Sequence, residues 1–137
     1  MLSQTVGYAV TAMGWVAGSG DGPVLVRDIA AGTGIPSAYL AKIVNSLARK
    51  GFVVTQRGTK GGVALAHRPE SITIYDLCAA LDDPLVKERC MLGMASCSDD
   101  RRCPAHEFWK AQREKELEFL RRTTLSDVAA FEHRRTR

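Results

Sequence analysis

The first hydrophobic pattern in the chain has the period of a helix that buries one stripe. Over residues 4–17, apolar side chains recur at intervals of three and four positions. Glycines at positions 18, 20 and 22, followed by Pro23, then interrupt the pattern and predict a loop. The stripe that defines this core helix consists of Val6, Ala9, Val10, Met13, Val16 and Ala17.

Two further helices are predicted on either side of a tight turn. A short helix over residues 26–32 is followed by Gly34-Ile35-Pro36, and a longer helix begins near Ser37 and stops at Gly51. The longer helix buries Leu40, Ile43, Val44 and Leu47 and exposes small, polar and cationic side chains, which suit close approach to the major groove of DNA. Any helical hairpin with a solvated face is the competing interpretation. The exposed set is Ser37, Ala38, Ala41, Lys42, Asn45 and Arg49.

A β-hairpin is predicted directly after the longer helix. Residues 52–56 and 63–66 have strand-forming composition, and the segment between them contains three glycines together with Arg57 and Lys60. A basic, glycine-rich hairpin after a candidate recognition helix is typical of the wing of a winged helix, in which a cation can enter the minor groove or contact phosphate. A phosphate-binding nucleotide loop is disfavoured because the Gly-Lys-[Ser/Thr] pattern and the helix that should follow it are both missing.

The next helical pattern contains the first of four cysteines. Thr73 and Asp76 resemble a capping box, and Cys78 then falls on an apolar helical stripe. We therefore interpret Cys78 as a buried small hydrophobic residue and exclude it from any metal site.

The other three cysteines lie in a segment with neither a helical nor a strand period. Cys90, Cys97 and Cys103 are followed by His106, three residues after the last cysteine. Such a segment cannot bury three thiols for packing, whereas three sulfurs and one imidazole nitrogen form a four-ligand set for a metal centre. The wide spacing favours an iron-sulfur cluster, because structural zinc sites commonly use Cys-x-x-Cys pairs. Structural zinc and redox-active thiols remain alternatives.

A long charged helix is predicted over residues 105–122, followed by a short terminal helix over residues 125–131. The longer helix has a narrow apolar seam, which gains most by packing against a second copy, although packing across its own domain is the alternative. We expect it to be a dimerisation helix. The side chains expected at that interface are Phe108, Trp109, Leu117 and Leu120.

Length and charge narrow the possible functions. A chain of 137 residues accommodates one compact domain with an arm, and its net charge of +4 arises within residues 1–72, which hold seven Lys/Arg against three Asp/Glu. A polyanionic partner is therefore expected there. No membrane span, secretion signal or grouped catalytic residues are apparent, so we expect a soluble, cytoplasmic protein without enzymatic activity and without a disulfide framework.

These features predict a mainly α fold with a small β-hairpin wing, divided into three parts. Residues 1–82 form a winged helix-turn-helix DNA-binding domain, residues 83–104 a cysteine-containing cluster-binding loop, and residues 105–137 the dimerisation helix and C-terminal tail. An iron-sulfur carrier or scaffold that uses the winged fold for protein contacts is a further alternative to a regulator.

The chain resembles the Rrf-two regulators, which include the IscR-like and NsrR-like iron-sulfur repressors. The resemblance covers residues 5 to about 130. It rests on the three cysteines of the loop and on four sequence stretches, namely Tyr8-Ala9-Val10-Thr11-Ala12-Met13, Ile35-Pro36-Ser37-Ala38-Tyr39-Leu40, Arg57-Gly58-Thr59-Lys60-Gly61-Gly62 and Cys103-Pro104-Ala105-His106-Glu107-Phe108-Trp109.

The resemblance implies a homodimeric transcriptional regulator, expected to be a repressor, that senses iron-sulfur status, redox change or nitric oxide. Its partner would be a pseudo-palindromic operator in double-stranded DNA. By position, Cys90, Cys97 and Cys103 match the cysteines that bind a 2Fe-2S or 4Fe-4S cluster, and His106 matches the fourth ligand of the IscR-like branch. The expected DNA-binding residues, to which the matched stretches add Tyr39 and Thr59, are Ser37, Ala38, Tyr39, Lys42, Asn45, Arg57, Thr59 and Lys60.

Two positions differ from the family pattern. The gap between the first two loop cysteines is one residue longer than the usual spacing, which affects the path of the loop. In addition, Ala41 stands where IscR-like proteins carry a recognition-helix Glu that tunes operator choice. The DNA preference of those proteins therefore does not transfer to this chain.

Overall fold

The computed structural model describes residues 1–92, 100 and 103–135, and its first three helices are those predicted from the sequence. They are α1 (Gln4–Gly18), α2 (Val26–Thr33) and α3 (Ser37–Arg49). The turn between α2 and α3 depends on Gly34, whose φ of +79° is a left-handed conformation that glycine adopts without strain. The observed helix bounds lie within two residues of the predicted ones.

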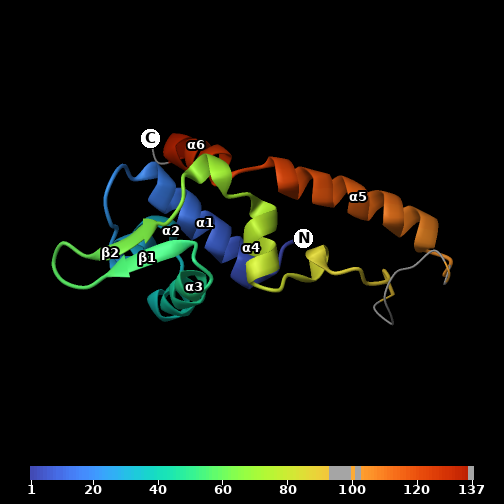
Figure 1. Ribbon diagram of the computed structural model, residues 1–137, viewed down its shortest axis with the longest axis horizontal. Coiled ribbons are helices and arrows are strands. Elements are labelled where there is room, and N and C mark those ends of the chain that lie inside the picture. Colours follow the sequence, from blue (N-terminus) through green and yellow to red (C-terminus); the bar gives the residue numbers. More distant parts are fainter. Residues whose placement is uncertain (93–99, 101–102, 136–137) are drawn as a thin grey trace.

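The wing is a two-stranded antiparallel hairpin made of β1 (Val53–Gln56) and β2 (Gly62–Leu65) (Figure 1). Val53 pairs with Leu65 at the base, and Gln56 pairs with Gly62 beside the tip. β2 is also held on its other side, because the backbones of Val24 and Val63 exchange two hydrogen bonds of 2.8 and 2.7 Å. This short ladder fixes the start of α2 against the wing, and the sequence pattern did not predict it.

Gly62 occupies the tightest backbone position in the wing. Its φ is +131°, and a Cβ at this position would contact the backbone carbonyl of Val24 and approach the amide nitrogen of Leu25 to 2.9 Å. Only a residue without a side chain fits, so the register of the hairpin depends on this glycine.

The segment after the wing contains α4 (Ile74–Ala80) between two short 3-10 helices, η1 (Pro69–Ser71) and η2 (Pro84–Val86). The predicted capping box is confirmed. The Asp76 amide donates to Thr73 Oγ1 at 3.1 Å, and the Thr73 amide donates to Asp76 Oδ2 at 2.9 Å. The two 3-10 helices were not predicted, although each begins at a proline, which favours the first position of a helix.

A buried carboxylate ties η2 to the N-terminus. Asp83 is 1% exposed, and its two carboxylate oxygens accept hydrogen bonds from the backbone amides of Ser3 (2.8 Å) and Leu85 (2.9 Å). Ser3 is itself the N-cap of α1, where its hydroxyl accepts from the Val6 amide. The carboxylate therefore connects the beginning of α1 with the segment that leads toward Cys90.

The C-terminal part consists of an arm and a helix that returns to the domain. α5 (His106–Arg122) extends away from the winged-helix body, and α6 (Leu125–Arg135) lies along α1 (Figure 1). The base of α5 is fixed by two backbone hydrogen bonds of 2.9 Å, from the Ile74 amide to the Thr123 carbonyl and from the Leu125 amide to the Ile72 carbonyl.

The terminal helix is longer than predicted, and the sequence pattern did not reveal what it packs on. Thr124 caps it through Asp127: the Asp127 amide donates to Thr124 Oγ1 at 3.3 Å, and the Thr124 amide donates to Asp127 Oδ2 at 2.9 Å. Gly14 of α1 lies directly beneath the side chain of Val128.

One hydrophobic core joins the helices and the wing. Its fully buried members come from α1 (Met13), α2 (Ile29), α3 (Leu40), α4 (Leu77) and the start of α6 (Leu125). The predicted fold class, mainly α with a β-hairpin wing, is therefore confirmed. Within the described part of the chain, no helix has both the length and the apolar character needed to cross a membrane.

Candidate nucleic-acid interface and cysteine site

The outer face of α3 carries exposed small and polar side chains, whereas its inner face is buried. Ser37, Ala38, Lys42 and Asn45 are all exposed, and Ala41 is half-buried among them. This division arises because the apolar residues of α3 recur at helical spacing and all pack into the core. Four of the predicted DNA-binding residues thus share one accessible helix face.

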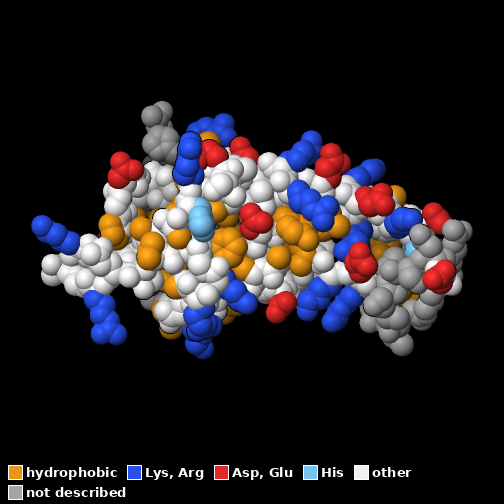
Figure 2. All heavy atoms as spheres, viewed as in Figure 1, with side chains coloured by type: hydrophobic (Ala, Val, Ile, Leu, Met, Phe, Trp, Pro, Cys, Tyr) orange, Lys and Arg blue, Asp and Glu red, His pale blue; other side chains and the backbone are white. Residues whose placement is uncertain are grey.

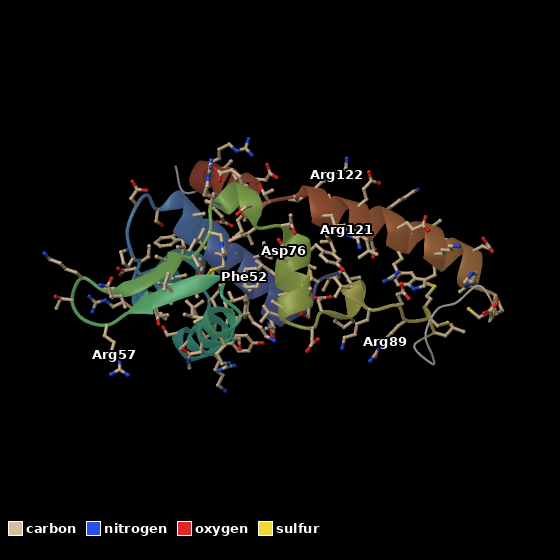
Figure 3. All side chains as sticks on the ribbon, viewed as in Figure 1. Phe52, Arg57, Asp76, Arg89, Arg121 and Arg122 are labelled. Carbon is tan, nitrogen blue, oxygen red and sulfur yellow. The ribbon has the colours of Figure 1, made fainter. Side chains whose placement is uncertain are left out.

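The wing tip adds exposed cationic and hydroxyl side chains to the same end of the molecule. Arg57, Thr59 and Lys60 are exposed, and Arg57 points away from the body of the domain (Figure 3). From Ser37 to Gly62 the sequence contains five Lys or Arg residues and no Asp or Glu. Figure 2 accordingly shows basic side chains projecting from the end of the molecule that carries α3 and the wing. Such a surface attracts a polyanion.

A groove of about 740 Å³ runs between α3 and the wing. Its lining combines apolar residues, among them Leu25, Val44 and Val63, with polar side chains such as Asn45 and Gln56, and none of the described residues that line it is acidic. The start of α2 closes one side, because the hydrogen bonds between Val24 and Val63 hold it there. The groove is lined by Leu25, Val26, Arg27, Ala41, Val44, Asn45, Thr55, Gln56, Gly58, Thr59, Gly62 and Val63.

Tyr39 differs from the other predicted DNA-binding residues because it is committed to packing. It is half-buried, its hydroxyl lies 2.6 Å from Thr5 Oγ1, and its ring meets the ring of Tyr8 edge to face at 5.4 Å. Tyr39 therefore anchors the start of α3 to the start of α1. The contacts of Tyr39 with Thr5 and Tyr8 thus help to position the exposed residues of α3.

Three groove residues were not among the sequence-based candidates. Arg27 is exposed on the first turn of α2, and Thr55 and Gln56 are exposed on β1. Alternation along β1 does not explain this, because Thr55 and Gln56 are consecutive and both exposed. Nothing local to the sequence indicates that Arg27 lies beside the wing, because its position depends on a backbone ladder between segments almost forty residues apart.

The structure brings two of the predicted metal ligands together. The Sγ atoms of Cys90 and Cys103 are 3.4 Å apart, within hydrogen-bond distance but too far for a disulfide bond between them. Cys90 is buried and Cys103 is half-buried. Cys97 lies outside the described residues. This pair joins the segment after η2 to the segment before α5, so the loop is closed at its base by its first and last cysteines.

His106 lies next to this pair as the first residue of α5. It is only 3% exposed, and its backbone amide donates to the Cys103 carbonyl at 3.0 Å. Three residues further on, Trp109 Nε1 donates to the carbonyl of Arg89 at 2.8 Å. The start of α5 therefore contacts both ends of the cysteine loop, at Arg89 and at Cys103. Among the described residues, however, no three His, Cys, Asp or Glu side chains form a potential metal site.

The sulfur pair has the chemistry and approximate spacing of a shared metal centre. Two sulfurs bound to one tetrahedral metal ion at about 2.3 Å would lie about 3.8 Å apart, and the observed separation is 3.4 Å. A disulfide would instead require about 2.05 Å. Two converging thiols, with the buried residue His106 three positions after the second, are donor types that zinc and iron-sulfur clusters use.

Cys78 has the opposite environment to the paired cysteines. It is fully buried on α4, and burial, reinforced by the nearby negative charge of Asp83, raises the pKa of its thiol from 9.0 to about 12. The neutral thiol is the stable form at physiological pH, which agrees with its assignment as a core residue.

We expect Cys78 in the folded protein to resist alkylation by iodoacetamide at pH 8. The thiolate is the reactive species, and raising the pKa by three units lowers its fraction about a thousandfold. Mass spectrometry should show unmodified Cys78 in the native protein and full modification in 6 M guanidinium chloride. Because the folded pKa is raised, reactivity should increase only as the pH approaches 12. Rapid native labelling at pH 8 would contradict this environment.

The residues expected at the dimer interface divide into two groups. Phe108 is 62% exposed, as the prediction requires, and Trp109 is half-buried with its indole N–H engaged. Leu117 and Leu120 are instead buried in the core of their own subunit, which corrects their assignment, because α5 also packs on α4. Phe119 is 54% exposed and lines a hollow of about 340 Å³ with Leu2, Ile74 and Leu85 among its other walls.

Comparison with known protein families gives a match over most of the chain. The model of the Rrf2 (Rrf-two) family, described as "Iron-dependent Transcriptional regulator", matches residues 2–130. The chain is 33% identical over 136 residues to an HTH-type transcriptional regulator of Aquifex aeolicus, covering 98% of this chain and 94% of that protein. It is 35% identical over 122 residues to the HTH-type transcriptional regulator IscR of Yersinia pseudotuberculosis, covering 88% and 74%.

Solved structures of similar proteins share the fold. CymR (YrzC), the global cysteine regulator of B. subtilis, superposes with a TM-score of 0.80 at 29% identity, covering 96% of this chain and 97% of that one. IscR of T. potens superposes with a TM-score of 0.72 at 26% identity, covering 93% and 84%. With an exposed helix face, a basic wing and a family match over nearly its whole length, this chain belongs to the Rrf2 family of winged-helix transcriptional regulators.

Proposed function

We propose that this transcriptional regulator binds operator DNA as a homodimer and senses its signal through an iron-sulfur cluster held by Cys90, Cys97, Cys103 and His106. The observation that carries the sensor proposal is the convergence of the Cys90 and Cys103 sulfurs, 3.4 Å apart, at the buried start of α5. The description of the family as iron-dependent and the similarity to IscR support it.

The four ligands would divide the work of holding the cluster. Cys90 and Cys103 close the base of the loop, and His106, buried on the first turn of α5, would supply an imidazole nitrogen. Cys97, from the middle of the loop, would supply the third sulfur. When bound, an iron-sulfur cluster supplies a redox-active centre that oxygen, nitric oxide or iron shortage can alter. A change in the cluster would then alter how well ordered the segments around Cys90 and Cys103 are.

A continuous set of contacts connects the loop base with the recognition helix. Asp83 holds the Ser3 amide at the start of α1, and Thr5, two residues later, lies within hydrogen-bond distance of the Tyr39 hydroxyl on α3. A shift of the segment before Cys90 would therefore move the end of α1 that positions α3. Coupling of this kind requires that the signal stabilise one arrangement more than the other.

The DNA-facing part of the proposal assigns different tasks to α3 and the wing. Ser37, Lys42 and Asn45 on the outer face of α3 would contact base edges and phosphates in the major groove. Arg57 and Lys60 at the wing tip would contact the neighbouring minor groove or its phosphates. Two copies paired through the exposed aromatic side chains of α5 would place two such units on a pseudo-palindromic operator.

The proposal is tested by preparing the full-length protein without oxygen and measuring iron, acid-labile sulfide, visible absorbance and operator affinity. We expect iron and sulfide in amounts stoichiometric with the protein, together with a change in affinity when the iron is removed by chelation. Oxygen-free protein that contains zinc, or neither iron nor sulfide, would overturn the sensor. The assignment of α3 and the wing to DNA would be unaffected by that result.

A thiol-based redox regulator is the second candidate, favoured by the same sulfur pair. The Cys90 and Cys103 thiols need to approach by only about 1.4 Å to form a disulfide. In that reaction two thiols lose two protons and two electrons to an oxidant such as a peroxide. Metal-free protein whose affinity for DNA responds to peroxide and recovers with dithiothreitol would favour this candidate.

A further inference from the structure

The groove between α3 and the wing lies where a DNA strand has to pass. When a recognition helix occupies a major groove and a wing tip occupies the adjacent minor groove, the sugar-phosphate strand that separates the two grooves runs between them. We propose that the groove holds this strand and that Arg27 of α2 neutralises one of its phosphates. The inference rests on the proposed roles of α3 and the wing.

The lining of the groove suits a phosphodiester backbone. Asn45, Thr55, Gln56 and Thr59 supply amide and hydroxyl donors, and no carboxylate is among the lining residues. The lining also includes Gly58 at the wing tip and the small Ala41 on α3, which leave room for a passing strand. Such a site takes a sugar-phosphate chain through charge and hydrogen bonds without reading the bases.

Among the residues that the structure describes, Arg27 is the one cationic side chain that lines the groove. The cations predicted from the sequence, Lys42, Arg57 and Lys60, do not line it and project from α3 and the wing tip instead. Arg27 is exposed, and no ion pair with another described residue holds its guanidinium. An unpaired guanidinium beside neutral donors provides the charge that a phosphate needs at this point.

The backbone hydrogen bonds between Val24 and Val63 hold the start of α2, and with it Arg27, in a fixed position relative to the wing. The two bonds, of 2.7 and 2.8 Å, lie three residues before Arg27 and join that segment to β2. The first turn of α2 is therefore fixed relative to the hairpin rather than free to move with the loop that precedes it. Arg27 and the wing would grip the strand from two sides as one unit.

The test is to measure the affinity of full-length Arg27→Ala for operator DNA and for unrelated duplex DNA at several salt concentrations. Removing one phosphate contact should lower the slope of log K against log salt by about 0.9 and weaken binding about eightfold at 0.1 M salt. Both duplexes should be affected alike, because the contact reads no base. Arg27→Lys should retain the slope.

Matched variants separate this inference from the proposal on which it rests. Arg68→Ala removes an exposed arginine that pairs with Glu70 away from the groove, and it should leave the slope unchanged. Arg57→Ala tests the wing itself. If Arg57→Ala weakens binding and Arg27→Ala leaves the slope unchanged, the role of Arg27 is wrong and the wing assignment stands. If both variants bind DNA as the unmodified protein does, the proposed DNA face is wrong and the inference fails with it.

Discussion

Replacing Cys103 with alanine should reduce the iron content of oxygen-free protein from stoichiometric to background. Cys103 supplies one of the two sulfurs that converge at the base of the loop. Without it the proposed ligand set is reduced to Cys90, Cys97 and His106, and one coordination position of the cluster is left without a protein ligand. The measurement combines iron and sulfide assays with visible absorbance. Because Cys103 is half-buried at the end of the loop rather than in the core, the variant should remain folded.

Cys78→Ala is the matched control for this experiment. It removes one thiol as well, but from the core of α4, where the raised pKa keeps the sulfur protonated. It should retain iron and the visible spectrum, with a loss of stability of about 1 kcal/mol from the small cavity. Retention of full iron content by Cys103→Ala, or its loss in Cys78→Ala, would contradict the assignment of the ligands.

Gly62→Ala should lower the free energy of unfolding by about 3 kcal/mol, measured by urea denaturation. Two costs act together. Alanine strains at a φ of +131°, and its Cβ would meet the backbone of Val24, which cannot move without breaking the ladder to Val63. Because the same ladder positions the start of α2, the variant should also bind DNA less tightly than its remaining folded fraction would explain.

Gly58→Ala provides the comparison, because alanine there would also be strained by a positive φ but its Cβ would meet no neighbouring atom. Gly58 has a φ of +104°, and nothing lies within 4 Å of a Cβ built on it. We expect a loss of about 1–2 kcal/mol from strain alone. Equal effects of the two substitutions would show that the contact with Val24 is not what makes Gly62 necessary.

Local patterns in the sequence were sufficient to predict the first five α-helices and the hairpin, but not the two 3-10 helices. The helices over α1 to α5, the hairpin and the capping box of Thr73 and Asp76 all follow from periodicity, turn residues and side-chain chemistry. The packing of α6 on α1 could not be predicted, because the fit between Gly14 and Val128 depends on a contact more than a hundred residues apart. The burial of Leu117 and Leu120 was missed because it depends on the packing of α5 on α4, which the pattern within α5 does not reveal.

The sequence also indicated part of the candidate site. Residue types identified the basic wing and the cysteine loop, and the structure places Cys90 next to Cys103. The position of Arg27 beside the wing could not be predicted, because it is set by the ladder through Val24. The sequence also did not reveal that the Tyr39 hydroxyl contacts Thr5, and the assignment of Tyr39 to DNA stays a prediction. Residue types and their spacing indicate which residues are candidates for a site. They do not indicate the tertiary contacts that position those residues.

The hydrogen bonds at the base of α5 determine how the arm can move. The Ile74 amide donates to the Thr123 carbonyl and the Leu125 amide donates to the Ile72 carbonyl, so these bonds oppose rotation of the arm relative to the domain that carries α3. The arm and the domain are therefore expected to move together. In a pair of such chains joined through their arms, a tilt of a few degrees at the joint would be carried undiminished to the two recognition helices and would alter the distance between them along the DNA.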